Sequence, residues 1–299
     1  MRVVTFTVPP EYDGRKLRAF LRGDAQISYA FYATLRHIPD AVTRDGIPVR
    51  SIDRVRTGDR IRVAFPDEQT KLTPTEMPLC ILYEDEDLLV LDKPGDIAMH
   101  PSHGHQTDTL ANGVTAYFLK SGSQGVFHAV GRLDKGTSGV TLCAKHTYAA
   151  SRMNGHTEKT YLALVDCVLS GAGTIDRPIC RPDPGKTERA CGEPGEHAVT
   201  HYEVLYAGES KSLVRLTPET GRTHQIRVHM ASIGAPLTGD ALYGTADPSL
   251  GRHLLHCRTV RVHHPISDKV MTFTAPLPPE FIHMLHRCLP DVQNFVLDP

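Results

Sequence analysis

Hydrophobic and polar positions change period along the chain, and the first 65 residues combine short segments of both kinds. Residues 14–22 place apolar side chains at the spacing of one helix face, and basic residues fill most of the other positions. A second helix-like stretch runs from Ser28, a suitable N-cap, to His37. In residues 54–65 a Thr-Gly-Asp turn precedes a segment of alternating apolar and basic side chains. We expect a small α/β module over residues 1–65.

The rest of the chain predicts a second, larger domain. Residues 66–78 are polar, contain proline and have no periodicity, which indicates a linker before a domain at 79–299. The segment CILYEDEDLLVLDKPG (80–95) is typical of a β-hairpin with an acidic turn. Strands are expected at 140–144, 160–169, 199–206, 213–217, 259–263 and 270–274, and helices at 109–119, 147–154 and 223–233. Because strands and helices do not alternate regularly, this pattern predicts an α+β fold with a mixed sheet.

The charge is distributed unevenly between the two parts. The 299 residues are 40% hydrophobic and 22% charged, as in a folded protein, and 33 Lys and Arg against 34 Asp and Glu give a net charge of −1. This balance excludes a histone-like basic protein and an acidic tail protein. Residues 1–70 carry 12 basic and nine acidic residues, whereas residues 71–110 carry a net charge of −6. We therefore expect the N-terminal module, and not the hairpin, to face the phosphates of a nucleic acid.

Membrane, disulfide and cofactor signals are weak. The longest apolar runs have about five residues, against about 20 for a membrane-spanning helix. The N-terminus lacks the apolar stretch of a secretory signal. The seven cysteines are widely spread and form no C-x-x-C pair, which favours reduced thiols in a cytoplasmic protein. No phosphate-binding loop, dinucleotide fingerprint or metal-ligand spacing is present, so we expect neither a cofactor nor a metal.

The segment GRLDKGTSG (131–139) is a candidate for catalysis. Asp134 lies between Arg132 and Lys135, and opposite charges nearby favour the ionised form of a carboxyl group. An ionised carboxylate can act as a nucleophile or stabilise an oxocarbenium-like centre. The alternative is an ordinary turn with surface ion pairs, which composition alone favours.

Two further segments combine charge with ring systems. In EKTYLALV (158–165), Lys159 and Tyr161 are two residues apart and face the same side of a strand, so the ring could stack on a base while the ammonium meets a phosphate. An ordinary half-buried tyrosine is the alternative. The segment TGRTHQIRVHM (220–230) is too polar for a buried core helix. It predicts either a solvated helix or a helix whose start binds an anion and whose Arg227 pairs with a carboxylate. His224 and His229 are five residues apart and cannot share a helix face, which argues against a zinc site.

Five segments, in order, resemble the RluA family of RNA pseudouridine synthases. They are YEDEDLLVLDKPGDIAMHP (83–101), GRLDKGTSGV (131–140), EKTYLALV (158–165), TGRTHQIRVHM (220–230) and the run from GAPLTGDALYG to HHPISDKVMTFTAPLP (234–278). The N-terminal module is similar, more loosely, to a small RNA-binding domain first described in a small-subunit ribosomal protein. This chain departs from the family at one point: Gly131 stands where members usually have His.

The resemblance implies a fold, an activity and a set of site residues. The fold is a mixed, mainly antiparallel sheet flanked by helices and loops. The activity is the cofactor-independent isomerisation of uridine to pseudouridine in ribosomal or transfer RNA. Asp134 corresponds to the essential aspartate, Tyr161 to the tyrosine that lies against the target ring and is a proposed base for the carbon-5 proton, and Arg227 to the arginine that pairs with the aspartate. The expected substrate-binding residues are Arg132, which enters the space left by the flipped base, Leu133, Lys159, Arg222 and His224.

Rival functions belong to other classes. A non-catalytic RNA-binding protein of the same fold should have lost Asp134 or Tyr161, and both are present. A nucleoside hydrolase or glycosidase should have paired carboxylates or a calcium-type cluster of aspartates, and the acidic run at 84–87 lies in a hairpin turn. We expect a monomer that acts on RNA and does not bind membranes.

Overall fold

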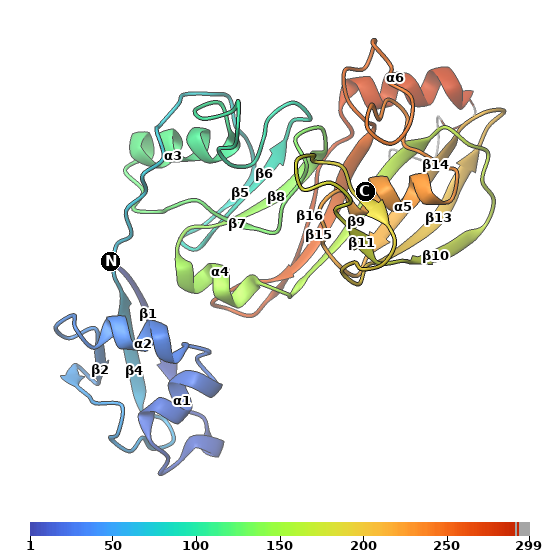
Figure 1. The fold of residues 1–299 in the computed structure, drawn as a ribbon. Coiled ribbons are helices and arrows are strands. Elements are labelled where there is room, and N and C mark those ends of the chain that lie inside the picture. Colours follow the sequence, from blue (N-terminus) through green and yellow to red (C-terminus); the bar gives the residue numbers. More distant parts are fainter. Residues whose placement is uncertain (291, 293–299) are drawn as a thin grey trace.

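The computed structural model describes residues 1–290 and 292, and the first 65 residues form a sheet of their own (Figure 1). This sheet is antiparallel throughout and has the order β1-β4-β2-β3. Its elements are β1 (Arg2–Thr7), η1 (Pro10–Tyr12), α1 (Leu17–Gly23), α2 (Tyr29–Leu35), β2 (Val42–Arg44), β3 (Ile47–Pro48) and β4 (Arg60–Phe65). Both expected helices are present. Leu17, Phe20 and Leu21 form the buried face of α1, and Ser28 Oγ accepts a hydrogen bond from the Phe31 N–H at 3.1 Å.

The second sheet has ten strands and contains the predicted hairpin. Its order is β10-β13-β14-β9-β15-β8-β6-β5, with β16 paired to β15 and β7 to β8. The strands are β5 (Cys80–Glu84), β6 (Leu88–Lys93), β7 (His128–Val130), β8 (Ser138–Ala144), β9 (Thr157–Val165), β10 (Ala172–Asp176), β13 (Val199–Ala207), β14 (Ser212–Pro218), β15 (Leu255–His263) and β16 (Val270–Thr274). Among the described strands of this sheet, β8 and β15 pair in parallel and the other pairs are antiparallel. The predicted α+β fold with a mixed, mainly antiparallel sheet is confirmed.

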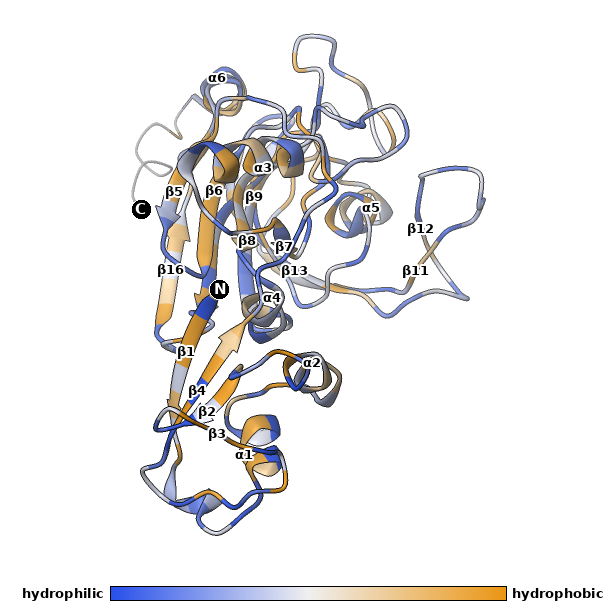
Figure 2. Ribbon diagram, turned by 90° about the vertical axis from the view of Figure 1, so that its left-hand side faces the viewer, coloured by the Kyte–Doolittle hydropathy of each residue, from blue (hydrophilic) through white to orange (hydrophobic). Residues whose placement is uncertain are grey.

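Helices cover both faces of this sheet. They are α3 (Leu110–Ser121), α4 (Thr147–Met153), α5 (Gln225–Ser232) and α6 (Pro279–Cys288), and a short ribbon of β11 (Ile179–Cys180) and β12 (Ala190–Cys191) extends beside α5 (Figures 1 and 2). On β9, Leu162 and Leu164 pack with α6, whereas Tyr161 lies in the core cluster that includes Ile226 and Met230 of α5. Because successive strand residues face opposite sides, Tyr161 is directed towards α5.

Several elements differ from the sequence prediction in their ends. The strand expected at 160–169 runs from Thr157 to Val165, and the one expected at 259–263 begins at Leu255. These two strands pair with each other, so pairing extends both towards the centre of the sheet. Helix α6 was not predicted. It buries Phe281, Met284 and Leu285 against strand residues that lie far away in the sequence.

The N-terminal sheet is docked on α4 and on the turn between β5 and β6. Tyr148 is 2% exposed and belongs to the N-terminal core: its ring stacks on Phe65 with centroids 4.5 Å apart, and its hydroxyl donates to the carbonyl of Ala25 at 2.7 Å. Figure 2 shows the N-terminal strands running up to α4. The two hydrophobic cores therefore meet at α4, and Ile266 of the catalytic domain also packs against the N-terminal core.

Ion pairs reinforce this docking. Arg2 makes a two-pronged pair with Asp87, from Nε at 2.7 Å and from Nη2 at 2.9 Å. Asp87 also accepts from His146 Nε2 at 2.9 Å, while His146 Nδ1 accepts the Ala149 N–H and so caps α4. Glu68, in the expected linker, accepts from the backbone N–H of Thr147 at 2.7 Å. The acidic hairpin turn thus binds a basic residue of the N-terminal module.

No helix among the described residues is both long enough and apolar enough to span a membrane.

Candidate active site

The loop between β7 and β8 carries Asp134. Gly131 begins this loop with φ at +75°, a conformation that favours glycine, and a Cβ at this position would lie 2.7 Å from Lys159 Nζ. Leu133 is buried in the main core and anchors the loop. The Asp134 side chain keeps 27% exposure and faces a cavity. The carboxylate is therefore positioned by a buried neighbour and remains accessible.

Two basic side chains, one of them fully buried, hold the backbone of the same loop. Lys93 Nζ donates to the carbonyl of Lys135 at 3.1 Å, and Arg252 Nη1 donates to the carbonyl of Gly136 at 2.8 Å. Burial lowers the pKa of Lys93 to about 7. These contacts restrain the turn that follows Asp134.

All eight predicted site residues line one cavity. They are Arg132, Leu133, Asp134, Lys159, Tyr161, Arg222, His224 and Arg227. Three separate segments supply them: the loop after β7, strand β9 and the start of α5. The structure brings the residues together, and their individual roles stay predictions.

Strand β9 presents Lys159 and Tyr161 to the cavity, as their spacing predicts. Tyr161 is almost fully buried, and this burial raises the pKa of its hydroxyl well above the usual value of about 10. The phenol is consequently protonated at neutral pH and presents a ring to whatever enters the cavity.

Arg227 lies between two carboxylates. Its Nη1 is 3.4 Å from Asp134 Oδ2, which is the partner the sequence predicted. Its Nε and Nη2 donate to the two oxygens of Asp240, each at 2.7 Å. Burial would lower the pKa of Arg227, but the hydrogen bonds to Asp240 outweigh it and raise that pKa. The two-pronged face of Arg227 is therefore occupied by Asp240, and Asp134 receives one longer contact.

Sequence reasoning missed Asp240. The residue belongs to the matched segment GAPLTGDALYG, but nothing local indicates a partner for its carboxylate. Its side chain is completely buried, which would raise its pKa, yet the hydrogen bonds of Arg227 hold that pKa below the usual value. The available signal was an acidic residue inside an otherwise apolar segment, because a buried carboxylate requires a partner.

Tyr243 joins Arg227 to His224. The Tyr243 ring centroid lies 5.0 Å from Arg227 Cζ, and the hydroxyl is 2.8 Å from His224 Nδ1. The same hydroxyl accepts the backbone N–H of Arg189, beside β12, at 2.8 Å. His224 has a positive φ of 56° just before α5, and burial lowers its pKa.

The predicted solvent exposure of α5 is wrong. Gln225 to Met230 are all buried. Gln225 Nε2 donates to the carbonyl of Val199 at 2.9 Å, and His229 Nε2 lies 3.0 Å from the carbonyl of Arg177. Neighbouring backbone satisfies these polar side chains, so the helix can be both polar and buried.

Arg132 and Arg222 are exposed at the cavity edge. Arg222 Nε donates to the carbonyl of His197 at 3.1 Å, and its Nη1 lies 3.2 Å from Glu196. Glu219 also lines the cavity, but it is exposed and hydrogen-bonds His201 at 2.7 Å.

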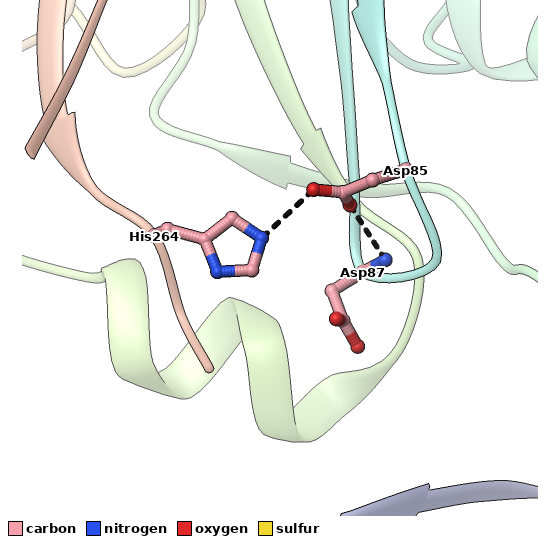
Figure 3. A group of neighbouring side chains, drawn as sticks. All are labelled: Asp85, Asp87 and His264. Carbon is pink, nitrogen blue, oxygen red and sulfur yellow. Dashed lines mark hydrogen bonds and ion pairs between the residues drawn. The ribbon is translucent and has the colours of Figure 1, made fainter. Parts of the chain in front are cut away.

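One group of side chains in the described part of the chain could bring ligand atoms together around a cation: Asp85, Asp87 and His264 (Figure 3). Asp85 accepts from His264 Nε2 at 2.8 Å and from the backbone N–H of Asp87 at 2.8 Å. The Asp87 carboxylate points away from Asp85 and binds Arg2 and His146. Since protein donors already engage these groups, the cluster joins segments of the fold at the domain boundary.

Comparisons with known proteins decide the family. A family model described as RNA pseudouridylate synthase matches residues 87–232. The "Uncharacterized RNA pseudouridine synthase YjbO" of Bacillus subtilis (strain 168) is 39% identical, and the match covers 77% of this chain and 84% of the relative. This chain belongs to the RluA family of RNA pseudouridine synthases. It therefore isomerises uridine in RNA to pseudouridine.

A second relative and a solved structure support the same family. The "Ribosomal large subunit pseudouridine synthase D" of Haemophilus influenzae (strain ATCC 51907 / DSM 11121 / KW20 / Rd) is 31% identical, and the match covers 94% of this chain and 89% of the relative. The solved structure of human RNA Pseudouridylate Synthase Domain Containing 1 is 28% identical, with a TM-score of 0.55, covering 68% of this chain and 86% of that one. Sequence and fold agree on the family.

Proposed function

We propose that Asp134 is the essential carboxylate of this synthase and acts on a uridine flipped into the cavity. The observation that carries the proposal is an accessible carboxylate beside a buried guanidinium, within a cavity that Tyr161 also lines. Flipping costs a few kcal/mol, which contacts with the RNA backbone can offset.

The reaction needs no co-reactant because its atoms balance. The bond between uracil N1 and ribose C1′ breaks, the base turns, and a bond between C5 and C1′ forms. C5 loses a proton and N1 gains one. Asp134 serves this sequence either by attacking C1′ or by removing the C2′ proton to give a glycal-like intermediate and returning that proton afterwards, and both routes require an ionised carboxylate.

The neighbouring residues divide the remaining tasks. Tyr161 lines the cavity from strand β9, so its ring can pack against the uracil ring. Lys159 and Arg222 supply charge for phosphates at the cavity edge, and His224 offers a neutral hydrogen-bonding ring beside them. Arg132 is exposed beside the cavity and suits the space that a flipped base leaves in the RNA. Leu133 holds the loop through its burial.

Asp134→Asn tests the role of the carboxylate. The amide keeps the shape and loses the charge, so we expect no detectable isomerisation and RNA affinity within about threefold of the parent. Carbodiimide labelling of treated RNA measures pseudouridine, and filter binding measures affinity. Full turnover by this variant would remove Asp134 from the mechanism. Release of free uracil by the parent would favour a glycosidase.

We also propose that the RNA belongs to the large ribosomal subunit. Relatives that match most of this chain carry that substrate in their names. Mapping pseudouridine in total RNA from a deletion strain, with and without a plasmid-borne copy, tests this proposal. Sites lost from transfer RNA instead of ribosomal RNA would contradict it.

We propose a cytoplasmic monomer. The seven cysteines are free, as expected of thiols in a reducing compartment. Cell fractionation with an antibody locates the protein, and an extracytoplasmic pool would contradict a cytoplasmic location. Sedimentation of the purified protein at micromolar concentration gives its mass, and the mass of a dimer would contradict a monomer.

A further inference from the structure

We propose that Asp240 is a positioning residue of this synthase, which holds Arg227 so that only Nη1 reaches the carboxylate of Asp134. The inference rests on the proposed roles of Asp134 and Arg227 and adds a third member to the pair. Asp240 itself is absent from the lining of the cavity, so it acts through Arg227.

The geometry of a guanidinium group explains the division. Its donors lie in one plane, and the edge formed by Nε and Nη2 matches the two oxygens of a carboxylate. In Arg227 both donors on this edge bind Asp240 at 2.7 Å. Nη1 is left for Asp134, and its distance to Oδ2 is 3.4 Å.

Asp240 is itself held rigidly. Its side chain is fully buried, and Oδ1 also accepts the backbone N–H groups of Leu242 at 3.0 Å and Tyr243 at 3.3 Å. The Tyr243 ring covers the guanidinium of Arg227 from the side, at 5.0 Å. The turn at residues 240–243 therefore restrains Arg227 in two ways: Asp240 binds its Nε and Nη2, and the Tyr243 ring packs against its guanidinium.

This arrangement has a chemical consequence. A two-pronged pair between Arg227 and Asp134 would engage both oxygens of the reacting carboxylate. By occupying the fork, Asp240 leaves one oxygen of Asp134 without an arginine partner and available to the ribose. Loss of Asp240 would release Arg227 to close on Asp134, so substrate would still bind but would react more slowly.

The test compares Asp240→Asn with Asp166→Asn. Asp166 is a matched control because it pairs with Lys211 and Thr238 and does not line the cavity. For Asp240→Asn we expect kcat to fall about ten- to a hundredfold, as is usual for groups that orient a functional side chain, and KM to change less than about threefold. Asp166→Asn should change neither.

Non-additivity separates positioning from a general structural role. If Asp240 acts through Arg227, the single-turnover rate of Arg227→Ala/Asp240→Asn should match that of Arg227→Ala alone. Multiplied losses in the double variant, or an Asp240→Asn variant with normal kcat, would overturn the proposal. If Asp240→Asn does not fold, Asp240→Glu is used instead, because it keeps the charge but displaces the Nε and Nη2 edge of Arg227. A normal kcat in Asp240→Glu would likewise overturn the proposal. An active Asp134→Asn variant would instead overturn the proposed function.

Discussion

Tyr148 joins the N-terminal core to the catalytic sheet, and its truncation should separate the two. The ring is 2% exposed, stacks on Phe65 and donates a hydrogen bond to Ala25, although its chain position is in α4 of the other sheet. Removing a buried aromatic side chain costs about 3–5 kcal/mol, which is about 10²·²- to 10³·⁷-fold in an equilibrium constant. Tyr148→Phe keeps the stacking and loses one hydrogen bond, worth about 1 kcal/mol.

Two measurements follow the docking. In differential scanning calorimetry, Tyr148→Ala should split one transition into two, while Tyr148→Phe should only shift it. Protease cleavage within 66–78 should accelerate in the Ala variant, because Glu68 and its neighbours lose their support on α4. Isomerisation at saturating RNA should persist, since the expected site residues lie elsewhere. A single unchanged transition and normal protease resistance in Tyr148→Ala would refute this account of docking.

Two further predictions concern charge. Arg18 and Arg22 are exposed on α1 and form no salt bridge among the described residues. Replacing both with Ala should reduce the slope of log affinity for RNA against log salt concentration by about 0.7–0.9 for each phosphate that the protein no longer neutralises. Arg215→Ala is the control, and an unchanged slope would show that the two arginines face solvent and not RNA. Burial would raise the pKa of Glu68, but hydrogen bonds from His128 and Thr147 hold it at about 2. Because the folded-state pKa of Glu68 is depressed, its contribution to the stability of docking should be fully present above about pH 4.3 and decline as the pH falls towards 2. The rate of proteolysis in the linker, measured against pH, should show this loss in the parent and a flatter profile in Glu68→Gln.

The sequence was most informative where the geometry is local. The period of two along a strand places Lys159 and Tyr161 on one face whatever surrounds them. The serine cap at Ser28 depends on a backbone conformation that neighbouring residues determine. The order of the motifs also indicated the family, which the comparisons confirm.

Expectations about solvent exposure and charge partners were less secure, because they depend on distant segments. The sequence of helix α5 favours a solvent-exposed helix. In the structure the carbonyls of Val199 in β13 and of Arg177 hydrogen-bond its polar side chains, and the helix is buried. The sequence predicts an acidic hairpin turn but no partner for it, whereas the structure pairs Asp87 with Arg2 across the domain boundary.

By itself the sequence determined the fold class, because strand period and turn chemistry are encoded in neighbouring residues. The resemblance carried by the order of its motifs implied the family and the eight side chains expected at the site. Only the tertiary structure decided how those side chains share their bonds. Arg227 has donors enough for two carboxylates, and its fork turns to Asp240 because packing buries that carboxylate against it. A buried charge must be paired where it lies, and no local pattern records which partner the fold will bring.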